Sequence, residues 1–275
     1  MMRLSGFADE ISSELDEQLR VLDQEGIRHL ELRGVWGKNV VELDRGETRT
    51  IKEGLAAGGF GISAIGSPIG KVGIEEPFEP HLDLFRRVLD IAHSLDSPYI
   101  RLFSFYIPPE DKPETYRNQV FDRLVAMLEA AEGSGVMLLH ENEKGIYGNT
   151  AERCQDLLQG IGHENLRAIF DPANFIQEGQ KPFTHCYPLL EHYVEYCHIK
   201  DAVMADGRVV PAGEGDGEIP KLLAALHKRE FTGFLSLEPH LSEVGRAGGF
   251  SGPELFKKAS QALKRILDDL GIHYE

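Results

Sequence analysis

Short apolar segments alternate with longer stretches of helical periodicity along the whole chain. Eight of these segments have the length and composition of buried strands, and they lie at residues 3–7, 29–33, 61–65, 99–103, 136–141, 167–171, 196–201 and 234–238. The stretches between them, such as 15–26, 81–95 and 121–135, place apolar residues three and four positions apart. Amphipathic helices have this spacing. The pattern therefore predicts a regular succession of strand–helix units.

Glycine and proline mark the expected ends of several helices. Four helices are expected to stop at glycines, at Gly26, Gly133 or Gly135, Gly160 or Gly162, and Gly233. Glycine closes a helix readily because it adopts the left-handed conformation at little cost. The last helix is expected to begin with a capping box formed by Ser251 and Glu254, with Pro253 in its first turn.

Eight strand–helix units in 275 residues fit an α/β fold of the (β/α)₈ type, the TIM barrel. A doubly wound open sheet rarely needs eight strands and usually has a glycine-rich turn after its first strand. Here the first strand is followed by "GFADEIS", which contains no such turn. No linker or low-complexity tract interrupts the chain, so we predict one barrel domain over residues 1–275.

Composition narrows the classes of partner. The formal net charge is −16, with 29 Lys and Arg against 45 Asp and Glu, which argues against nucleic-acid binding because that draws on clustered basic residues. No apolar run reaches 18 residues, so no membrane segment is expected. The three cysteines form no Cys-x-x-Cys, which indicates reduced thiols in a cytoplasmic protein. The oligomeric state, including a homo-oligomer, stays open.

The last four strand-like segments each end in a side chain that can bind a metal. In a TIM barrel the carboxyl ends of the strands face the active site. At these ends the sequence has Glu141, Asp171, His198 and Glu238. Three carboxylates and one imidazole form an oxygen-rich set that suits one divalent ion, with Mn²⁺ expected first and Mg²⁺, Co²⁺, Fe²⁺ or Zn²⁺ as alternatives. A shared cation would also explain a carboxylate at the end of the apolar segment that precedes Glu141.

Each of the four residues has an ordinary structural explanation when taken alone. A glutamate at a strand end is often a solvated rim residue, and His198 beside an apolar segment can be a hydrogen-bonded core residue. Asp171 precedes Pro172 in a sequence that is rich in turn formers. Their occurrence on four consecutive strands at one level favours a common metal site.

The chain resembles the xylose isomerase-like barrels, the sugar phosphate isomerase/epimerase superfamily, over nearly its whole length. The most specific similar segments are "VMLLHEN" (136–142), "FDPANF" (170–175), "HIKD" (198–201), "AGEGDGEI" (212–219) and "LSLEPH" (235–240). The segments "GFADEIS" and "ELRGVWGKNV" are also similar. The resemblance implies that Glu141, Asp171, His198 and Glu238 hold one divalent metal, usually manganese or a close substitute. It also implies that Glu141 and Glu238 are catalytic.

The implied chemistry is proton transfer next to the carbonyl of a keto-sugar or polyol, through an enediolate that the metal stabilises. Glu141 and Glu238 would flank the substrate, one taking a proton and the other returning one. Return from the opposite face gives an epimerase, and transfer to the neighbouring carbon gives an isomerase. Loss of a β-hydroxyl instead gives a dehydratase of the inosose type. A sugar-binding module without turnover is the remaining alternative.

Two departures from the resemblance bear on the substrate. Ketose 3-epimerases of this group typically have a histidine where this chain has Asn174, and an arginine where it has Met204. Asn174 can hydrogen-bond a substrate hydroxyl but cannot titrate near neutral pH, which puts a free ketohexose in doubt and favours a dehydratase. The endonuclease IV branch has additional histidine ligands, which are missing here from "GSPIG", "FSFY" and "DGR".

Further polar residues are candidates for substrate binding. Lys200 shares the inward face of its strand with His198, Lys71 follows the third strand, and Arg101 lies on the fourth. Each has an alternative explanation, as a neutralising charge, an exposed loop residue or a structural ion pair. Glu143 is an alternative ligand to Glu141, and Trp36 can either cover the pocket or pack elsewhere.

The loop after the seventh strand is acidic. Its carboxylates, on Glu214, Asp216 and Glu218, would repel a phosphate at the position that many barrels use to bind one. The sequence therefore favours an uncharged sugar or polyol as the substrate.

Overall fold

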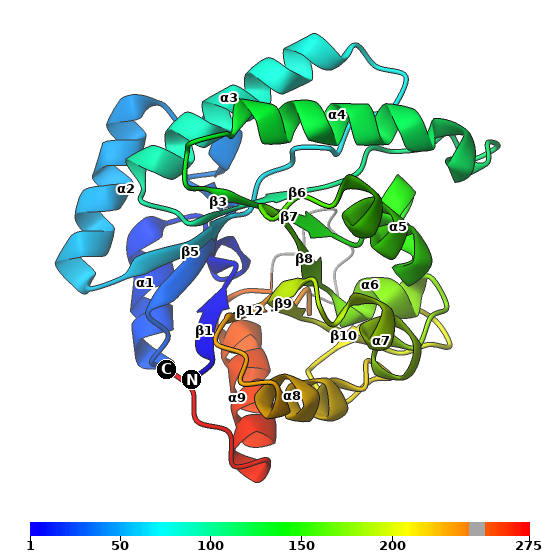
Figure 1. Ribbon diagram of the computed structural model, residues 1–275. Helices are drawn as coiled ribbons and strands as arrows, with labels where there is room; N and C mark the ends of the chain where they lie inside the picture. The colour runs from blue at the N-terminus through cyan, green and yellow to red at the C-terminus, as the bar shows by residue number, and fades with distance from the viewer. Residues whose placement is uncertain (242–250) are drawn as a thin grey trace.

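The computed structural model describes residues 1–241 and 251–275, and its centre is one parallel sheet of eight strands. The spatial order is β1-β12-β9-β8-β7-β6-β5-β2. The strands are β1 (Arg3–Gly6), β2 (His29–Leu32), β5 (Gly61–Ile65), β6 (Tyr99–Leu102), β7 (Met137–Glu141), β8 (Leu166–Phe170), β9 (Val194–Ile199) and β12 (Phe234–Leu237). A parallel bridge between Phe7 and Glu31 joins the two ends of the sheet. The result is a nearly closed barrel, seen along its axis in Figure 1.

Helices surround the barrel and connect successive strands (Figure 1). They are α1 (Leu15–Gln24), α2 (Arg45–Gly58), α3 (Phe78–Ser94), α4 (Arg117–Ala130), α5 (Ala151–Ile161), α6 (Pro172–Gln177), α7 (Tyr187–Leu190), α8 (Ile219–Lys228) and α9 (Pro253–Asp269). Shorter turns are η1 (Ala8–Glu10), η2 (Val40–Glu42), η3 (Pro113–Tyr116), η4 (Tyr147–Asn149) and the π-helical η5 (Pro182–Cys186). Two small hairpins pair β3 (Gly34–Val35) with β4 (Lys38–Asn39), and β10 (Asp201–Ala202) with β11 (Val209–Val210).

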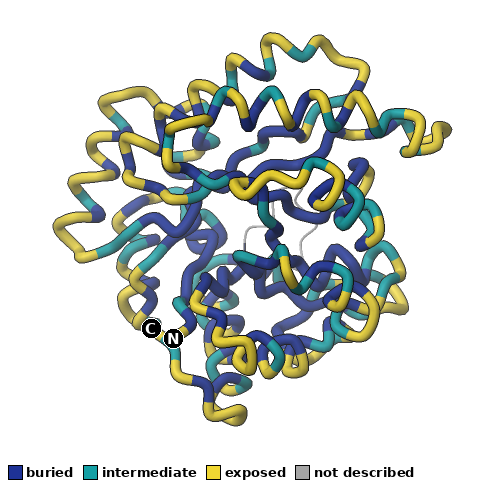
Figure 2. Tube along the Cα trace, in the orientation of Figure 1, coloured by how far each residue is buried: buried dark blue, intermediate teal, exposed yellow. Residues whose placement is uncertain are grey.

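Burial follows the predicted periodicity. In Figure 2 the strands are almost continuously buried, whereas the helices alternate between buried and exposed residues. The main core lies between the sheet and the inward faces of the helices. A second cluster, made of Ala64, Leu139, Ile169, Tyr196 and Phe234, is contributed by alternate positions of the strands. Such alternation fills the interior of a barrel with side chains.

The predicted strands are confirmed, but two predicted helix ends are wrong. Ser251 forms no capping box with Glu254, because its hydroxyl donates to a Glu10 carboxylate oxygen at 2.7 Å and Gly252 occupies the N-cap. α8 ends at Lys228, and Glu230 rather than Gly233 adopts the left-handed conformation. Gly233 precedes β12, where a Cβ would lie only 2.4 Å from the Glu195 carbonyl oxygen. Gly26 and Gly162 are left-handed, as predicted.

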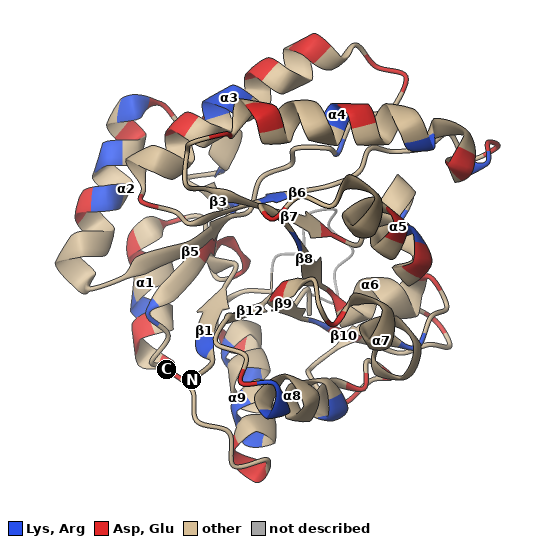
Figure 3. Cartoon of the chain, viewed as in Figure 1, with Lys and Arg blue, Asp and Glu red and all other residues tan. Residues whose placement is uncertain are grey.

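Charged side chains lie mainly on the outer helices and loops, with a smaller number near the barrel axis (Figure 3). Within the described part of the chain, no helix combines the length and the apolar character needed to cross a bilayer. All three cysteines belong to described residues and are buried free thiols. The predicted cytoplasmic location stays a prediction.

Candidate functional site

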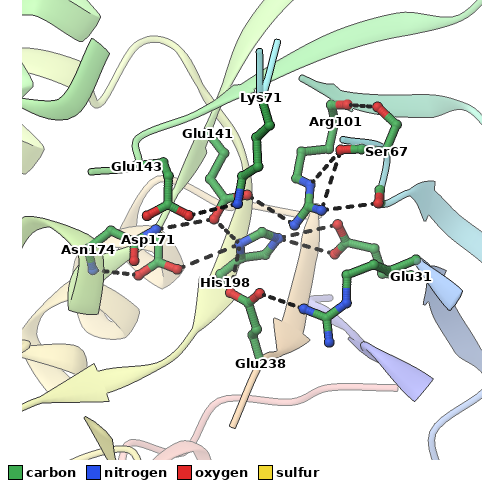
Figure 4. A network of polar contacts seen from close by, with 12 residues as sticks. Glu31, Ser67, Lys71, Arg101, Glu141, Glu143, Asp171, Asn174, His198 and Glu238 are labelled. Carbon is green, nitrogen blue, oxygen red and sulfur yellow. Dashed lines mark hydrogen bonds and ion pairs between the residues drawn. The ribbon is translucent and has the colours of Figure 1, made fainter. Parts of the chain in front are cut away.

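Glu141, Asp171, His198 and Glu238 meet at one point at the carboxyl end of the barrel. One ligand atom from each lies within 4.8 Å of the corresponding atoms of the other three. All four residues are buried, and Figure 4 shows the three carboxyl groups directed at the imidazole of His198. The structure thus brings together the four predicted metal ligands. Their assignment as ligands stays a prediction.

The strands place these side chains in register. Glu141 is the last residue of β7, and Asp171 directly follows β8, where it caps α6 by accepting the backbone N–H of Asn174 at 2.9 Å. His198 lies in β9 and pairs with Ser236 of β12. Glu238 follows Ser236 by two residues. Because successive strands are parallel and the residues occupy equivalent positions, their side chains converge at one level.

His198 presents a different environment to each ring nitrogen. Its Nδ1 lies 3.2 Å from Glu141, 3.6 Å from Glu238 and 3.7 Å from Asp171. Its Nε2 lies 3.2 Å from Glu31. Burial alone would lower the pKa of His198, but the carboxylates of Glu141 and Glu31 outweigh it and raise that pKa well above the ordinary value. In the metal-free arrangement these carboxylates therefore favour the charged form of the imidazole.

Two buried atoms at the centre, Asp171 Oδ2 and His198 Nδ1, form no hydrogen bond of good geometry and lie 3.7 Å apart. Their near neighbours are charged: Lys200 Nζ lies 2.8 Å from Asp171 Oδ2, and a Glu141 oxygen lies 3.2 Å from His198 Nδ1. Burial is the main cause that raises the pKa of Asp171 above its usual value. A carboxylate oxygen and an imidazole nitrogen that are buried without a well-aligned hydrogen bond fit a metal ion, which accepts electron pairs from such atoms.

Lys200 and Arg101, both predicted to bind substrate, form buried ion pairs with the predicted ligands. Lys200 Nζ lies 2.8 Å from both Asp171 and Glu238. Arg101 donates to Glu141 at 3.1 Å and to the Gly66 carbonyl at 3.0 Å. Although burial opposes it, the positive charges of His198 and Arg101 lower the pKa of Glu141 to about 2. Lys200 and Arg101 thus hold the carboxylates of the predicted ligands ionised and oriented.

Lys71 and Glu143 lie at the outer side of this site. Lys71 Nζ contacts a Glu143 oxygen at 3.0 Å and lies 4.3 Å from the centre of the Phe103 ring. Both side chains are partly exposed, and Glu143 is not part of the converging group. Trp36 lines a different hollow, with residues of α1 and α2, and does not cover the site. The geometry favours Glu141 over Glu143 as the predicted ligand.

Asn174 is buried beside Glu141. Its side-chain amide donates to the Asn142 carbonyl at 2.8 Å and to Glu141 at 3.3 Å. These donors are therefore directed at the protein, which holds the Glu141 carboxylate in place. A direct contact between Asn174 and substrate stays a prediction.

A second group of charged residues near the site was missed by the sequence reasoning. Arg33, which follows β2, donates to Asp9 at 2.7 Å, to Glu10 at 2.8 Å and to Glu238 at 3.2 Å. His240 Nε2 also lies 3.2 Å from Glu238, on a backbone with a left-handed φ of 44°. Extending the strand-end criterion to the second strand would have identified Arg33. Nothing in the sequence indicates the contact of His240.

The acidic loop after β9 is folded around Asp201. The backbone N–H groups of Gly213, Gly215 and Gly217 donate to its carboxylate at 2.8–3.1 Å. The other acids of the loop have partners of their own: Asp216 accepts from Met204 N–H at 2.7 Å, and Glu218 accepts from Thr184 N–H at 2.8 Å. These contacts hold the carboxylates of Asp216 and Glu218 within the loop but leave their negative charge in place, so the expected repulsion of a phosphate stays a prediction. The Asp201 carboxylate instead takes up three backbone N–H groups of the kind that bind phosphate.

Comparison with known proteins agrees with this architecture. The family profile described as xylose isomerase-like TIM barrel matches residues 19–266. The chain belongs to this family. No curated protein matches the sequence.

Solved structures resemble the fold over nearly the full length. A D-tagatose 3-epimerase-like protein is 18% identical with a TM-score of 0.80, and the match covers 98% of each chain. The probable 3-DHS dehydratase AsbF of petrobactin synthesis from Bacillus anthracis is 17% identical with a TM-score of 0.78, covering 96% of this chain and 99% of that one. The IOLI protein with a bound zinc atom is 17% identical with a TM-score of 0.75, covering 98% of each. Solved structures with this fold thus include one named as D-tagatose 3-epimerase-like and one named as a probable dehydratase.

Proposed function

We propose that the protein is a divalent-metal-dependent sugar isomerase or epimerase that moves a proton next to the carbonyl of a keto-sugar or polyol. The observation that carries the proposal is the convergence within 4.8 Å of four buried ligand atoms, three carboxylate oxygens and one imidazole nitrogen. The family supplies the class of chemistry, since structural neighbours include a D-tagatose 3-epimerase-like protein.

Glu141, Asp171, His198 and Glu238 would hold the ion, with His198 binding through Nδ1. The predominance of oxygen ligands favours Mn²⁺ or Mg²⁺, and the zinc atom in the IOLI protein keeps Zn²⁺ as an alternative. When bound, such an ion polarises a carbonyl and stabilises the negative charge that develops as the adjacent carbon loses a proton.

Glu141 and Glu238 are the proposed proton-transfer groups. Glu141 is the last residue of β7 and Glu238 directly follows β12, and both carboxylates lie near His198 Nδ1, at 3.2 Å and 3.6 Å. Although burial opposes it, Lys200 and His240 hold the pKa of Glu238 well below its usual value, so this carboxylate is ionised in the metal-free protein. Because the two carboxylates come from different strands, a sugar bound between them can lose a proton to one and gain a proton from the other.

The proposed substrate contacts are Lys71, Arg101, Lys200 and Asn174. Lys200 and Arg101 already contact the predicted ligands, so each can offer its remaining N–H groups to substrate oxygens. Lys71 lies farther out, where it would contact the end of the substrate away from the reacting carbon. The three basic groups among these contacts are each paired with a carboxylate, Lys71 with Glu143, Arg101 with Glu141, and Lys200 with Asp171 and Glu238. This pairing suits an uncharged sugar or polyol as the partner.

A dehydratase of a keto-polyol is the second candidate, and Asn174 favours it. This amide stands at the position of a histidine in ketose 3-epimerases and is bonded to Glu141 and Asn142. It therefore supplies no further titrating group for a second proton transfer. The fold neighbour named as a probable 3-DHS dehydratase is compatible with this alternative.

Incubation with candidate keto-sugars and keto-polyols in D₂O separates the candidates. With added Mn²⁺, we expect deuterium at a stereocentre or at the adjacent carbon, detected by mass spectrometry and NMR, and no exchange after chelation. A product lighter than the substrate by one water would show dehydration and would favour the dehydratase over the isomerase. If the purified protein showed no turnover and took up no metal, a sugar-binding module would be favoured.

Metal affinity should fall as the pH is lowered. The pKa of metal-free His198 is raised well above its ordinary value, whereas binding needs an unprotonated Nδ1. Below that pKa each bound ion displaces about one proton, so the dissociation constant should rise about tenfold for each unit of decreasing pH. Calorimetric titration with Mn²⁺ between pH 6 and 8 measures this slope. A constant affinity over the range would contradict binding through His198.

A further inference from the structure

Glu31 lies on the side of His198 that faces away from the three predicted carboxylate ligands. Its two carboxylate oxygens are 3.2 and 3.4 Å from Nε2, and both side chains are fully buried. Glu31 is not a member of the converging group. It belongs to β2, the last strand in the spatial order, whereas His198 belongs to β9, the third. Figure 4 shows the imidazole between Glu31 and the predicted ligands.

A chain of buried hydroxyls holds Glu31 from inside the barrel. Tyr196 O–H donates to Glu31 at 2.9 Å, and the hydroxyl of Ser63 lies 2.8 Å from that of Tyr196. Ser5 extends the chain, with its hydroxyl 2.6 Å from that of Ser63. Because a carboxylate only accepts hydrogen bonds, the direction of donation is set along the chain from Ser5 to Glu31.

The same arrangement determines which nitrogen of His198 keeps its proton. An unprotonated Nε2 would place a lone pair against both oxygens of Glu31, whereas an Nε2–H donates to them. The ring plane is restrained as well, because the edge of the imidazole packs on Phe7 with 5.1 Å between ring centres. Phe7 and Glu31 form the bridge that joins the two ends of the sheet, so this support is part of the barrel itself.

We propose that Glu31, oriented by Tyr196, is a positioning residue that keeps the proton on His198 Nε2 and directs the Nδ1 lone pair at the metal. This inference rests on the proposed metal-dependent function and adds a residue to it. A carboxylate that accepts from the remote N–H of a ligating histidine fixes its tautomer, and removing such a carboxylate weakens metal binding by about 10- to 100-fold.

The test uses Glu31→Gln, Tyr196→Phe and their combination, with Tyr99→Phe as a matched control. Tyr99 also lies on a barrel strand and loses the same hydroxyl, but its partner is Glu195 at 2.9 Å rather than a residue of the site. Zinc affinity is measured by chelator competition, and the Nε2-bound proton of His198 is followed by NMR of ¹⁵N-histidine-labelled protein with and without Zn²⁺. Melting curves followed by circular dichroism verify folding. If Glu31→Gln does not fold, the same measurements on Tyr196→Phe test the proposal.

We expect a slowly exchanging Nε2 proton in the wild type and in Tyr99→Phe, with unchanged zinc affinity in the latter. Glu31→Gln should lose the protected proton and bind zinc about 10- to 100-fold more weakly. Tyr196→Phe should weaken binding alone but add nothing in the Glu31→Gln background, since it acts through that carboxylate. Wild-type affinity in folded Glu31→Gln, or fully additive effects, would overturn the proposal. A protected proton in a wild type that binds no zinc would uphold the Glu31–His198 contact and remove the metal-dependent function.

Discussion

Glu238→Gln is expected to reduce turnover by about 10³-fold while leaving the barrel folded, because it removes a proposed proton acceptor without changing its shape. The fold should survive since each cation around Glu238 keeps another partner. Lys200 remains 2.8 Å from Asp171, and Arg33 remains bonded to Asp9 and Glu10. Steady-state rates under saturating Mn²⁺, together with a thermal melt, measure the two effects separately.

Glu143→Gln is the matched control for this substitution. It makes the same change to a nearby carboxylate that pairs with Lys71 and lies outside the converging group. We expect turnover to fall by less than about tenfold, because Glu143 contacts no predicted ligand. Activity of Glu238→Gln within tenfold of the wild type would remove Glu238 from catalysis. A larger loss in Glu143→Gln than in Glu238→Gln would show that the wrong carboxylate had been chosen.

The fold was readable from the sequence because a barrel repeats one local pattern. Each strand is a short, largely buried segment and each helix has one apolar face, so the alternation of the two patterns is visible without knowledge of the pairing. The helix ends were less predictable. Ser251 has the sequence of a cap, but its hydroxyl bonds to Glu10, which lies 241 positions away in the chain. A distant partner of this kind overrides a local preference.

The convergence of the predicted ligands was also accessible, because parallel strands bring equivalent positions together. The surrounding network was not. Arg33 contacts Glu238 across 205 positions, and Tyr196 contacts Glu31 across 165. Such pairs arise where the barrel closes and where its interior side chains interdigitate, and neither is set by the period of a single strand.

The direction of a loop carboxylate is similarly set by its partners. Glu218 is acidic and follows β9, which suggested repulsion of a phosphate, yet its oxygens bond to Thr184. Asp201, which was part of a recognised motif, instead organises three glycines of the loop. Charge counted along a sequence therefore gives the total charge near a site but not the field inside it.

Inside this site the carboxylates outnumber the permanent cations. Among the described residues of the network, the acids are Asp9, Glu10, Glu31, Glu141, Asp171 and Glu238, and the bases are Arg33, Arg101 and Lys200. Burial makes such an excess unfavourable unless further positive charge is present. In the metal-free protein, the positive charge of a protonated His198 offsets part of this excess. A divalent ion that displaced the His198 proton would bring more positive charge to the carboxylates.

Lys200→Met is expected to destabilise the metal-free protein by about 3–5 kcal/mol, since it leaves Asp171 and Glu238 buried without their ammonium partner. Although burial opposes it, these two carboxylates raise the pKa of Lys200 well above its usual value, so the wild-type side chain is charged. The melting temperature should fall on the order of 10 °C. Saturating Mn²⁺ should restore much of the loss, because the ion supplies positive charge to the same carboxylates.

Lys71→Met makes the same substitution in a more exposed pair. The side chains of Lys71 and Glu143 are 32% and 19% exposed, and an ion pair in such surroundings contributes about 0–1 kcal/mol. Calorimetric melts of both variants, with and without Mn²⁺, therefore compare a buried charge with a partly solvated one. Equal melting temperatures for the two metal-free variants would contradict the requirement for charge at Lys200. A Mn²⁺-induced increase no larger in Lys200→Met than in the wild type would contradict binding of the ion beside Asp171 and Glu238.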